Sequence, residues 1–335
     1  MKRFPIIKHS AMWLAISAAL AIICGVIFFK YEKLSIQFTG GMEIKVDSQL
    51  DKQKVTREVT ELLEKDGFNN PAVSVGQKDG YDNILLQINV DNQEKVVKLG
   101  NDVQKYLIDN DYIKDSNGIL EQAIIGASIG DYVKNSTIWA LALGFLFIAI
   151  YIAFAFIGVR DFISPAVLGF LTLSTLFFDV AIPAGAYGIL MAFNQTLQVD
   201  TIFVLGILTI MGYSINDTII IFDRIRENIR KYKKMNLGEL VNKSLNETLT
   251  RTLLTASTTL LALLALYFWG GKVISTFTLP IIIGIIIGSF SSICLAAPLL
   301  LKVLPALRLC VPPSKVSVAP EATFQAPVLV PPPLV

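Results

Sequence analysis

One carboxylate, Asp217, lies inside an apolar stretch of the chain that is long enough to cross a membrane. The stretch covers residues 201–222 and contains no other charged residue. A charge at the centre of a bilayer costs about 2.5–3.5 kcal/mol on insertion scales, so such residues are by default candidates for function and need a partner. A buried carboxyl group that gains and loses a proton as its surroundings change is the chemistry of a proton relay.

The basic partner expected for Asp217 is Arg251, which precedes the next apolar stretch, residues 252–269. Asp217 lies six residues before Asp223, which puts it roughly 9 Å from the helix end at 1.5 Å per residue. Two antiparallel helices would then hold the acid and the base at similar depth. Small and hydroxyl residues let membrane helices approach and form hydrogen bonds. The polar side chains expected to support the pair are Tyr213, Asn216, Thr209, Thr255 and Thr258.

Each acidic residue also has a simpler interpretation. A buried pair of Asp217 and Arg251 can fix the register of two helices without carrying any ion. Asp179, in the apolar stretch before Asp217, is a third relay candidate, and polar packing inside the bundle is its alternative.

The composition places these residues in a membrane protein. The chain has 335 residues, of which 53% are hydrophobic and 17% charged, whereas soluble domains average about 25% charged residues. The formal net charge is +2 and His9 is the single histidine, which excludes a histidine-rich metal site. We expect no cofactor, no metal and no nucleic-acid partner. Six apolar runs have lengths that fit membrane spans, namely residues 11–29, 136–159, 165–186, 201–222, 252–269 and 273–301.

A polar region, residues 30–134, separates the first span from the other five. Period-2 and period-3.6 patterns predict strands and helices in the order βαββαβ, which is the ferredoxin-like split motif. The strands are expected over residues 35–46, 72–77, 83–90 and 119–125, and the helices over residues 51–66 and 93–110. Gly40 and Gly41 lie in the first strand, where we expect either a turn into the domain or a hinge.

Basic residues in the short loops predict one orientation. Residues 223–251 carry eight of them, whereas the loop near residues 187–200 carries none. The charged stretch after Asp223 either sets topology on a solvated helix or lies on the anionic inner leaflet. We expect a cytoplasmic N-terminus, an outer domain and a cytoplasmic tail. The segments expected are the N-terminus (1–10), the first span (11–29), the outer α+β domain (30–134), a five-helix bundle (135–305) with a basic inner loop (223–250), and a disordered proline-rich tail (306–335).

Residues 212–227, GYSINDTIIIFDRIRE, are very similar to the signature of the SecF family, the smaller half of the SecD–SecF translocation motor in the resistance-nodulation-division (RND) superfamily. Residues 38–41 match the family's FTGG, and residues 251–257, RTLLTAS, resemble its RTxxTS. Residues 125–130, IGASIG, resemble VGPxVG with alanine in place of proline, and Phe178 stands where many members have a histidine. The similarity covers roughly residues 10–305.

The resemblance implies a polytopic α-helical protein whose six transmembrane helices form one RND half transporter with a small outer domain. It implies a bacterial cytoplasmic (inner) membrane protein that uses a proton or sodium gradient to drive late steps of protein export. Asp217 would carry the proton and Arg251 would be its charge partner. A SecD-like subunit would supply the second six-helix half, and a SecY-type channel and the exported preprotein would be further partners.

Three other functions compete with this interpretation. An intramembrane aspartyl protease would use Asp179 and Asp217, but residues 214–217 read SIND and the GxGD signature is absent from the sequence. A half transporter for a small molecule or lipid would usually have a larger, repeated outer domain. A purely structural scaffold is the third alternative. No enzymatic activity is therefore expected.

Overall fold

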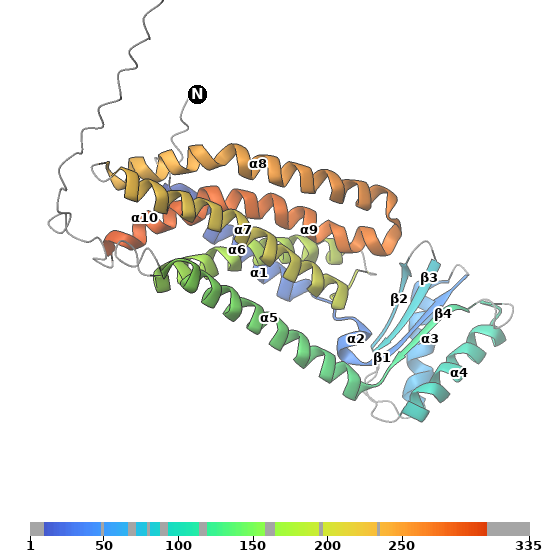
Figure 1. Cartoon of the computed structure of the whole chain (residues 1–335). Helices are drawn as coiled ribbons and strands as arrows, with labels where there is room; N and C mark the ends of the chain where they lie inside the picture. The colour runs from blue at the N-terminus through green and yellow to red at the C-terminus, as the bar shows by residue number, and fades with distance from the viewer. Residues whose placement is uncertain are drawn as a thin grey trace, which may run out of the picture.

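A computed structural model describes residues 10–47, 50–65, 72–78, 81–87, 93–113, 119–157, 165–193, 197–232 and 235–306. The extreme N-terminus and the proline-rich tail beyond residue 306 lie outside this part. The molecule has a long helical bundle with a small α/β domain at one end (Figure 1). The bundle helices are α1 (Ser10–Tyr31), α5 (Ala127–Ala155), α6 (Pro165–Phe193), α7 (Thr201–Lys231), α8 (Leu237–Trp269), α9 (Gly271–Ser291) and α10 (Ala297–Ala306).

The six predicted spans are confirmed as helices, because six helical stretches are long and apolar enough to cross a membrane. Helix α5 exposes large apolar side chains along most of its length and α8 along its second half, whereas α7 and α9 are the most enclosed. Exposed apolar rows of this kind suit contact with lipid. The centre of the bundle is therefore formed around α6, α7 and α9.

Small residues bring α1 and α6 into close contact. A β-carbon added at Gly185 would lie 2.3 Å from Cys24 Cβ and 2.5 Å from Cys24 Cα. Membrane helices have little hydrophobic drive to associate, so such close packing is a main source of their stability.

Most of the bundle helices differ from their predicted ends. Helix α7 continues past residue 222 to Lys231, so the charged residues from Asp223 to Lys231 belong to the same helix as Asp217. The last span is interrupted by a π-helical segment, Ser292–Ala296, which joins α9 to α10. Segments of this kind are rare and occur frequently at functional sites.

The α/β domain has the predicted βαββαβ order, and this prediction is confirmed. Its strands are β1 (Gly41–Val46), β2 (Ala72–Lys78), β3 (Tyr81–Gln87) and β4 (Ile119–Ile125), and its helices are α3 (Lys52–Lys65) and α4 (Gln93–Asp109). The strands pair antiparallel in the order β2-β3-β1-β4, which is the ferredoxin-like arrangement.

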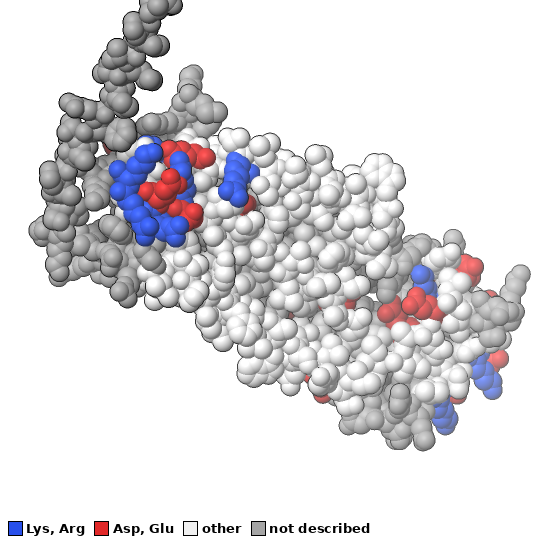
Figure 2. Space-filling view, in the orientation of Figure 1, with Lys and Arg blue, Asp and Glu red and all other residues white. Residues whose placement is uncertain are grey.

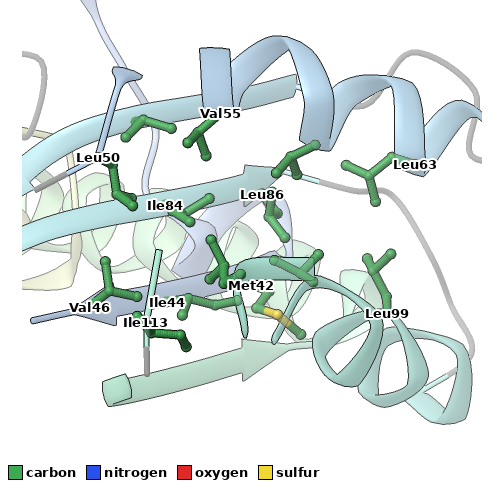
Figure 3. Packing of buried hydrophobic residues seen from close by; sticks show 14 residues of the cluster. Met42, Ile44, Val46, Leu50, Val55, Leu63, Ile84, Leu86, Leu99 and Ile113 are labelled. Carbon is green, nitrogen blue, oxygen red and sulfur yellow. The ribbon is translucent and has the colours of Figure 1, made fainter. Parts of the chain in front are cut away.

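The core of this domain lies between the sheet and its two helices. Ile44 pairs with Ile84 and Met42 with Leu86, and all four side chains are fully buried. Figure 3 shows them directed toward Val55 of α3 and Leu99 of α4. Burying one such side chain is worth about 1.5–3 kcal/mol, so the domain has a core of its own.

The predicted strand over residues 35–46 is wrong in its first half. Residues Ile36–Thr39 form a short helix, α2, and the strand begins only at Gly41. The Ser35 side chain caps α2 by accepting a hydrogen bond from Gln37 N, and Gly40 ends it with a φ of 72°. Ile36 and Phe38 are both buried, so their alternation mimicked a strand.

A buried carboxylate holds the chain that enters α3. Asp82 is 3% exposed, and its Oδ2 accepts a hydrogen bond of 2.5 Å from Leu50 N. We expect Asp82→Ala to destabilise the α/β domain by about 1–3 kcal/mol, because it leaves a buried N–H without a partner. Asp82→Asn keeps an acceptor and should lose much less. Limited proteolysis of the detergent-solubilised chain would measure the difference, and equal cleavage rates for the two variants would contradict it.

Candidate ion-relay site between α6, α7 and α9

Asp217 lies in the middle of the bundle on α7 and is 1% exposed. Within the described part of the chain, neither of its carboxylate oxygens has a hydrogen-bond partner. The Ser289 side chain of α9 lies beside it, and the buried Ser289 hydroxyl is also without a hydrogen bond there. A buried polar group without a partner is costly, so this carboxyl group needs an explanation beyond packing.

Arg251 and Asp217 interact electrostatically, but the described residues show no ion pair between them. Arg251 is exposed on α8. Ion pairs lie toward the helix ends, where Arg224 contacts Glu247 at 2.7 Å and Glu227 at 2.5 Å. The predicted partners Asp217 and Arg251 therefore do not form an ion pair in the described part of the chain.

Asp179 is the most enclosed carboxylate of the bundle, with 0% of its surface exposed. One of its oxygens, Oδ2, accepts a hydrogen bond from the Ser214 hydroxyl of α7, and the Ser291 side chain of α9 lies next to it. Asp179 and Asp217 also interact electrostatically. Two like charges in one buried site repel, so a proton loaded onto either carboxyl relieves that repulsion.

Sequence reasoning missed the hydroxyl groups that lie beside these two acids. Ser214, Ser289 and Ser291 contact the carboxylates, and just beyond them Thr218 Oγ1 lies 3.2 Å from Ser292 Oγ. Gly288 allows α7 and α9 to approach, because its added β-carbon would lie 3.2 Å from Ser214 Cβ. The sequence signal that could have indicated them is three serines, Ser289, Ser291 and Ser292, within four residues of an apolar span. In the structure the last of these serines begins the π-helical segment.

The predicted supporting side chains do not all share one environment. Tyr213 is half-buried, and its side chain lies near Thr259 and Asp217. Thr209, Asn216 and Thr258 are exposed on the outside of α7 and α8, and Thr255 is half-buried. Exposed polar groups at the depth of a bilayer are unusual, so the outer surface of α7 and α8 is a second feature of the site.

Gly40 and Gly41 both have positive φ, 72° and 128°. They lie where α2 ends and β1 begins, against the start of α5. A β-carbon added at Gly40 would lie 2.8 Å from Ala127 Cα, and one added at Gly130 would lie 2.7 Å from Gly40 N. Glycine is thus required here by both conformation and close approach.

The fold and the buried carboxylates define a class: a polytopic membrane protein with the six helices of one half transporter and a ferredoxin-like domain inserted after the first. A family model described as "Protein export membrane protein SecD/SecF, C-terminal" matches residues 108–305. The chain belongs to this SecD/SecF family, and its similarity to SecF subunits over most of their length makes it a SecF-type member.

Three similar proteins show the extent of the match. Protein translocase subunit SecF of Sebaldella termitidis is 34% identical, over 82% of this chain and 82% of the relative. Protein translocase subunit SecDF of Thermus thermophilus is 34% identical, over 82% of this chain and 35% of the relative. The crystal structure of SecDF, a translocon-associated membrane protein from the same organism, superposes with a TM-score of 0.72 at 29% identity, over 91% of this chain and 39% of the SecDF chain. All three are described as translocation components, so they lend no support to the alternative of a small-molecule or lipid transporter.

Proposed function

We propose that this chain is the SecF-type half of an ion-driven motor that assists protein export across the bacterial cytoplasmic membrane. The observation that carries the proposal is the pair of enclosed carboxylates, Asp217 and Asp179, which lie beside serine hydroxyls in a membrane-spanning bundle. Buried ionisable residues of this kind mark ion pathways in membrane proteins.

The chemistry assigned to the site is reversible protonation. Asp217 takes up and releases the proton, and Asp179 is the second carboxyl group that can hold it. Ser214, Ser289 and Ser291 lie between or beside the two acids, and hydroxyl groups both donate and accept hydrogen bonds, as proton transfer requires. Arg251 is the charge partner assigned to Asp217. The gradient then shifts the bundle between two arrangements by differential protonation.

The charge distribution supports an orientation. Figure 2 shows Lys and Arg gathered at the end of the bundle that lies away from the α/β domain. This end contains the charged continuation of α7 and the start of α8, with Arg224, Arg226 and Lys243. By the positive-inside rule this end faces the cytoplasm, and the α/β domain faces the outside, where it can act on an emerging preprotein beside a SecY-type channel.

The surface of α7 supports the proposal of a second half. Leu205, Thr209, Gly212 and Asn216 are exposed and follow one another at spacings of four, three and four residues, which forms a stripe along the helix. We call these four residues the α7 stripe. The Thr209 hydroxyl donates to the Leu205 carbonyl at 2.8 Å, but the Asn216 amide facing lipid would lack hydrogen-bond partners. Gly212, which lies between them, allows another helix to approach. A SecD-like subunit is the partner proposed for this surface, next to Asp217 and Arg251.

A substitution at Gly212 tests whether the SecD-like subunit binds to the α7 stripe. An added β-carbon there has no atom within 4 Å, so Gly212→Leu should leave the chain folded. We expect the bulky side chain to block close approach and to abolish co-purification of the SecD-type subunit from the same organism. The measurement is the ratio of the two subunits after affinity capture of this chain in mild detergent.

Gly25→Leu is the matched control, because Gly25 of α1 also has open space around its added β-carbon. This variant should retain the partner. Retention of the partner by Gly212→Leu, or its loss in both variants, would contradict the proposed docking surface.

A further inference from the structure

The chain that enters the α/β domain is hydrogen-bonded to the loop that enters α7. We call residues 33–40 the linker segment. Ser35 N donates to the Val199 carbonyl at 2.9 Å, and Val199 N donates to the Lys33 carbonyl at 2.7 Å. Leu34 and Val199 form a parallel bridge between these segments. Two parts of the chain that are far apart in sequence are therefore joined just before α7 begins.

A side chain extends this junction onto the first residue of α7. The Gln37 Oε1 atom accepts two hydrogen bonds from Thr201, one from its backbone N–H at 2.9 Å and one from its hydroxyl at 2.7 Å. The first N–H groups of a helix have no partner within the helix. One of these groups, the Phe203 N–H, donates a hydrogen bond of 2.7 Å to Asp200 Oδ1. The cap of α7 is thus shared between its own loop and the linker segment.

The linker segment is also packed against the start of α5. A β-carbon added at Gly130 would lie 2.7 Å from Gly40 N, and one added at Gly40 would lie 2.8 Å from Ala127 Cα, so neither glycine has room for a β-carbon. Helix α5 follows β4, the last strand of the domain, and the linker segment leads into β1. Both covalent connections of the α/β domain are therefore in contact with each other at one place, so a displacement of the linker segment acts on the whole domain.

Helix α7 connects this place with the buried acid. Thr201 lies sixteen residues before Asp217, which is about 24 Å along a continuous helix. A tilt or shift of α7 at Asp217 must displace the two Thr201 donors at its other end. The linker segment, which contains Gln37 and Gly40, leads directly into β1. Strand β1 lies between β3 and β4 inside the sheet.

We propose that Gln37 is a coupling residue through which movement of α7 reaches the α/β domain. The inference rests on the proposed function, in which protonation of Asp217 moves the bundle. Gln37 touches neither the ion nor the relay acids, so it acts as a positioning residue. Its contact with Thr201 carries the displacement, and the Gly40–Gly130 contact makes the two connections of the domain follow together.

The test separates ion movement from export. Gln37→Met keeps the length of the side chain and removes the acceptor, and Thr201 is exposed, so its donors can bond to water instead. The variant is reconstituted with the SecD-type subunit and the channel in vesicles. We expect ion entry, read by pH-sensitive and sodium-sensitive dyes, to stay unchanged, while gradient-driven export of a preprotein falls to the level seen without a gradient.

Gln37→Glu is the matched control. Its carboxylate oxygen accepts the same two hydrogen bonds, and a negative charge at a helix N-terminus is favourable. This variant should keep both ion entry and export. Normal export by Gln37→Met would overturn the proposal, and so would a parallel loss of ion entry and export, because that result indicates a general structural role.

Export measured with Asp217→Asn tests the ion-driven motor separately from the coupling role of Gln37. If Asp217→Asn exports normally, the ion-driven motor itself is refuted. If Asp217→Asn is inactive and Gln37→Met exports normally, only the coupling role of Gln37 is refuted.

Discussion

Replacing Asp217 with asparagine is expected to reduce gradient-driven protein export to the level measured without a gradient. Asparagine has nearly the same shape, but it cannot take up and release a proton. Asp217 is 1% exposed and has no hydrogen-bond partner among the described residues, so the change removes no contact that holds the bundle together. The measurement is translocation of a preprotein into vesicles that contain the full complex, with and without an imposed gradient.

Asp223→Asn is the matched control on the same helix. Asp223 lies exposed near the end of α7, where it forms an ion pair with Arg226. An exposed pair of this kind is worth about 0–1 kcal/mol, so its loss should leave both export and folding intact. Normal gradient-driven export by Asp217→Asn would refute the relay, and equal loss in both variants would assign the effect to charge in general.

The second large effect is expected at the contact between α1 and α6. Gly185→Leu should prevent these helices from packing, because even the first added carbon would overlap the backbone of Cys24 at 2.5 Å. Overpacking a well-packed core usually costs about 1–3 kcal/mol and occasionally more, and here a backbone atom must move. We expect a sharp fall in the amount of folded chain in the membrane and a lower melting temperature in detergent.

Gly25→Leu provides the comparison, because it places the same side chain one residue from Cys24 but in open space. Its melting temperature should remain that of the unsubstituted chain. Equal melting temperatures for the two variants would show that the close α1–α6 contact is not a source of stability.

Much of the fold could be predicted from local patterns. The lengths of the apolar runs indicated six spans, and alternation in β1 together with the helical spacing of Val55 and Val59 indicated the βαββαβ domain. Helix α2 could not be predicted in this way, because Ile36 and Phe38 alternate as in a strand. Their burial depends on contacts with the bundle, and the ends of α2 depend on the Ser35 cap and the backbone of Gly40.

The candidate site was predicted only in part, for a physical reason. Asp217 and Asp179 stand out because charge in an apolar run is costly. The serines of α9 carry no such penalty, and which face of a helix they occupy depends on neighbours that are distant in sequence. The separation of Arg251 from Asp217 likewise depends on how α7 and α8 rotate against each other. Helical spacing alone does not determine that rotation.

The π-helical segment, Ser292–Ala296, changes the direction in which side chains point along the last span. A π-helical turn contains one more residue than a turn of a regular α-helix. The side chains after it are therefore rotated by about 100° about the helix axis, relative to an uninterrupted α-helix. Side chains of α9 and α10 that a regular helical wheel places on one face therefore point in different directions. The serines before the segment lie beside Asp179 and Asp217, and apolar residues of α10 after it pack into the bundle.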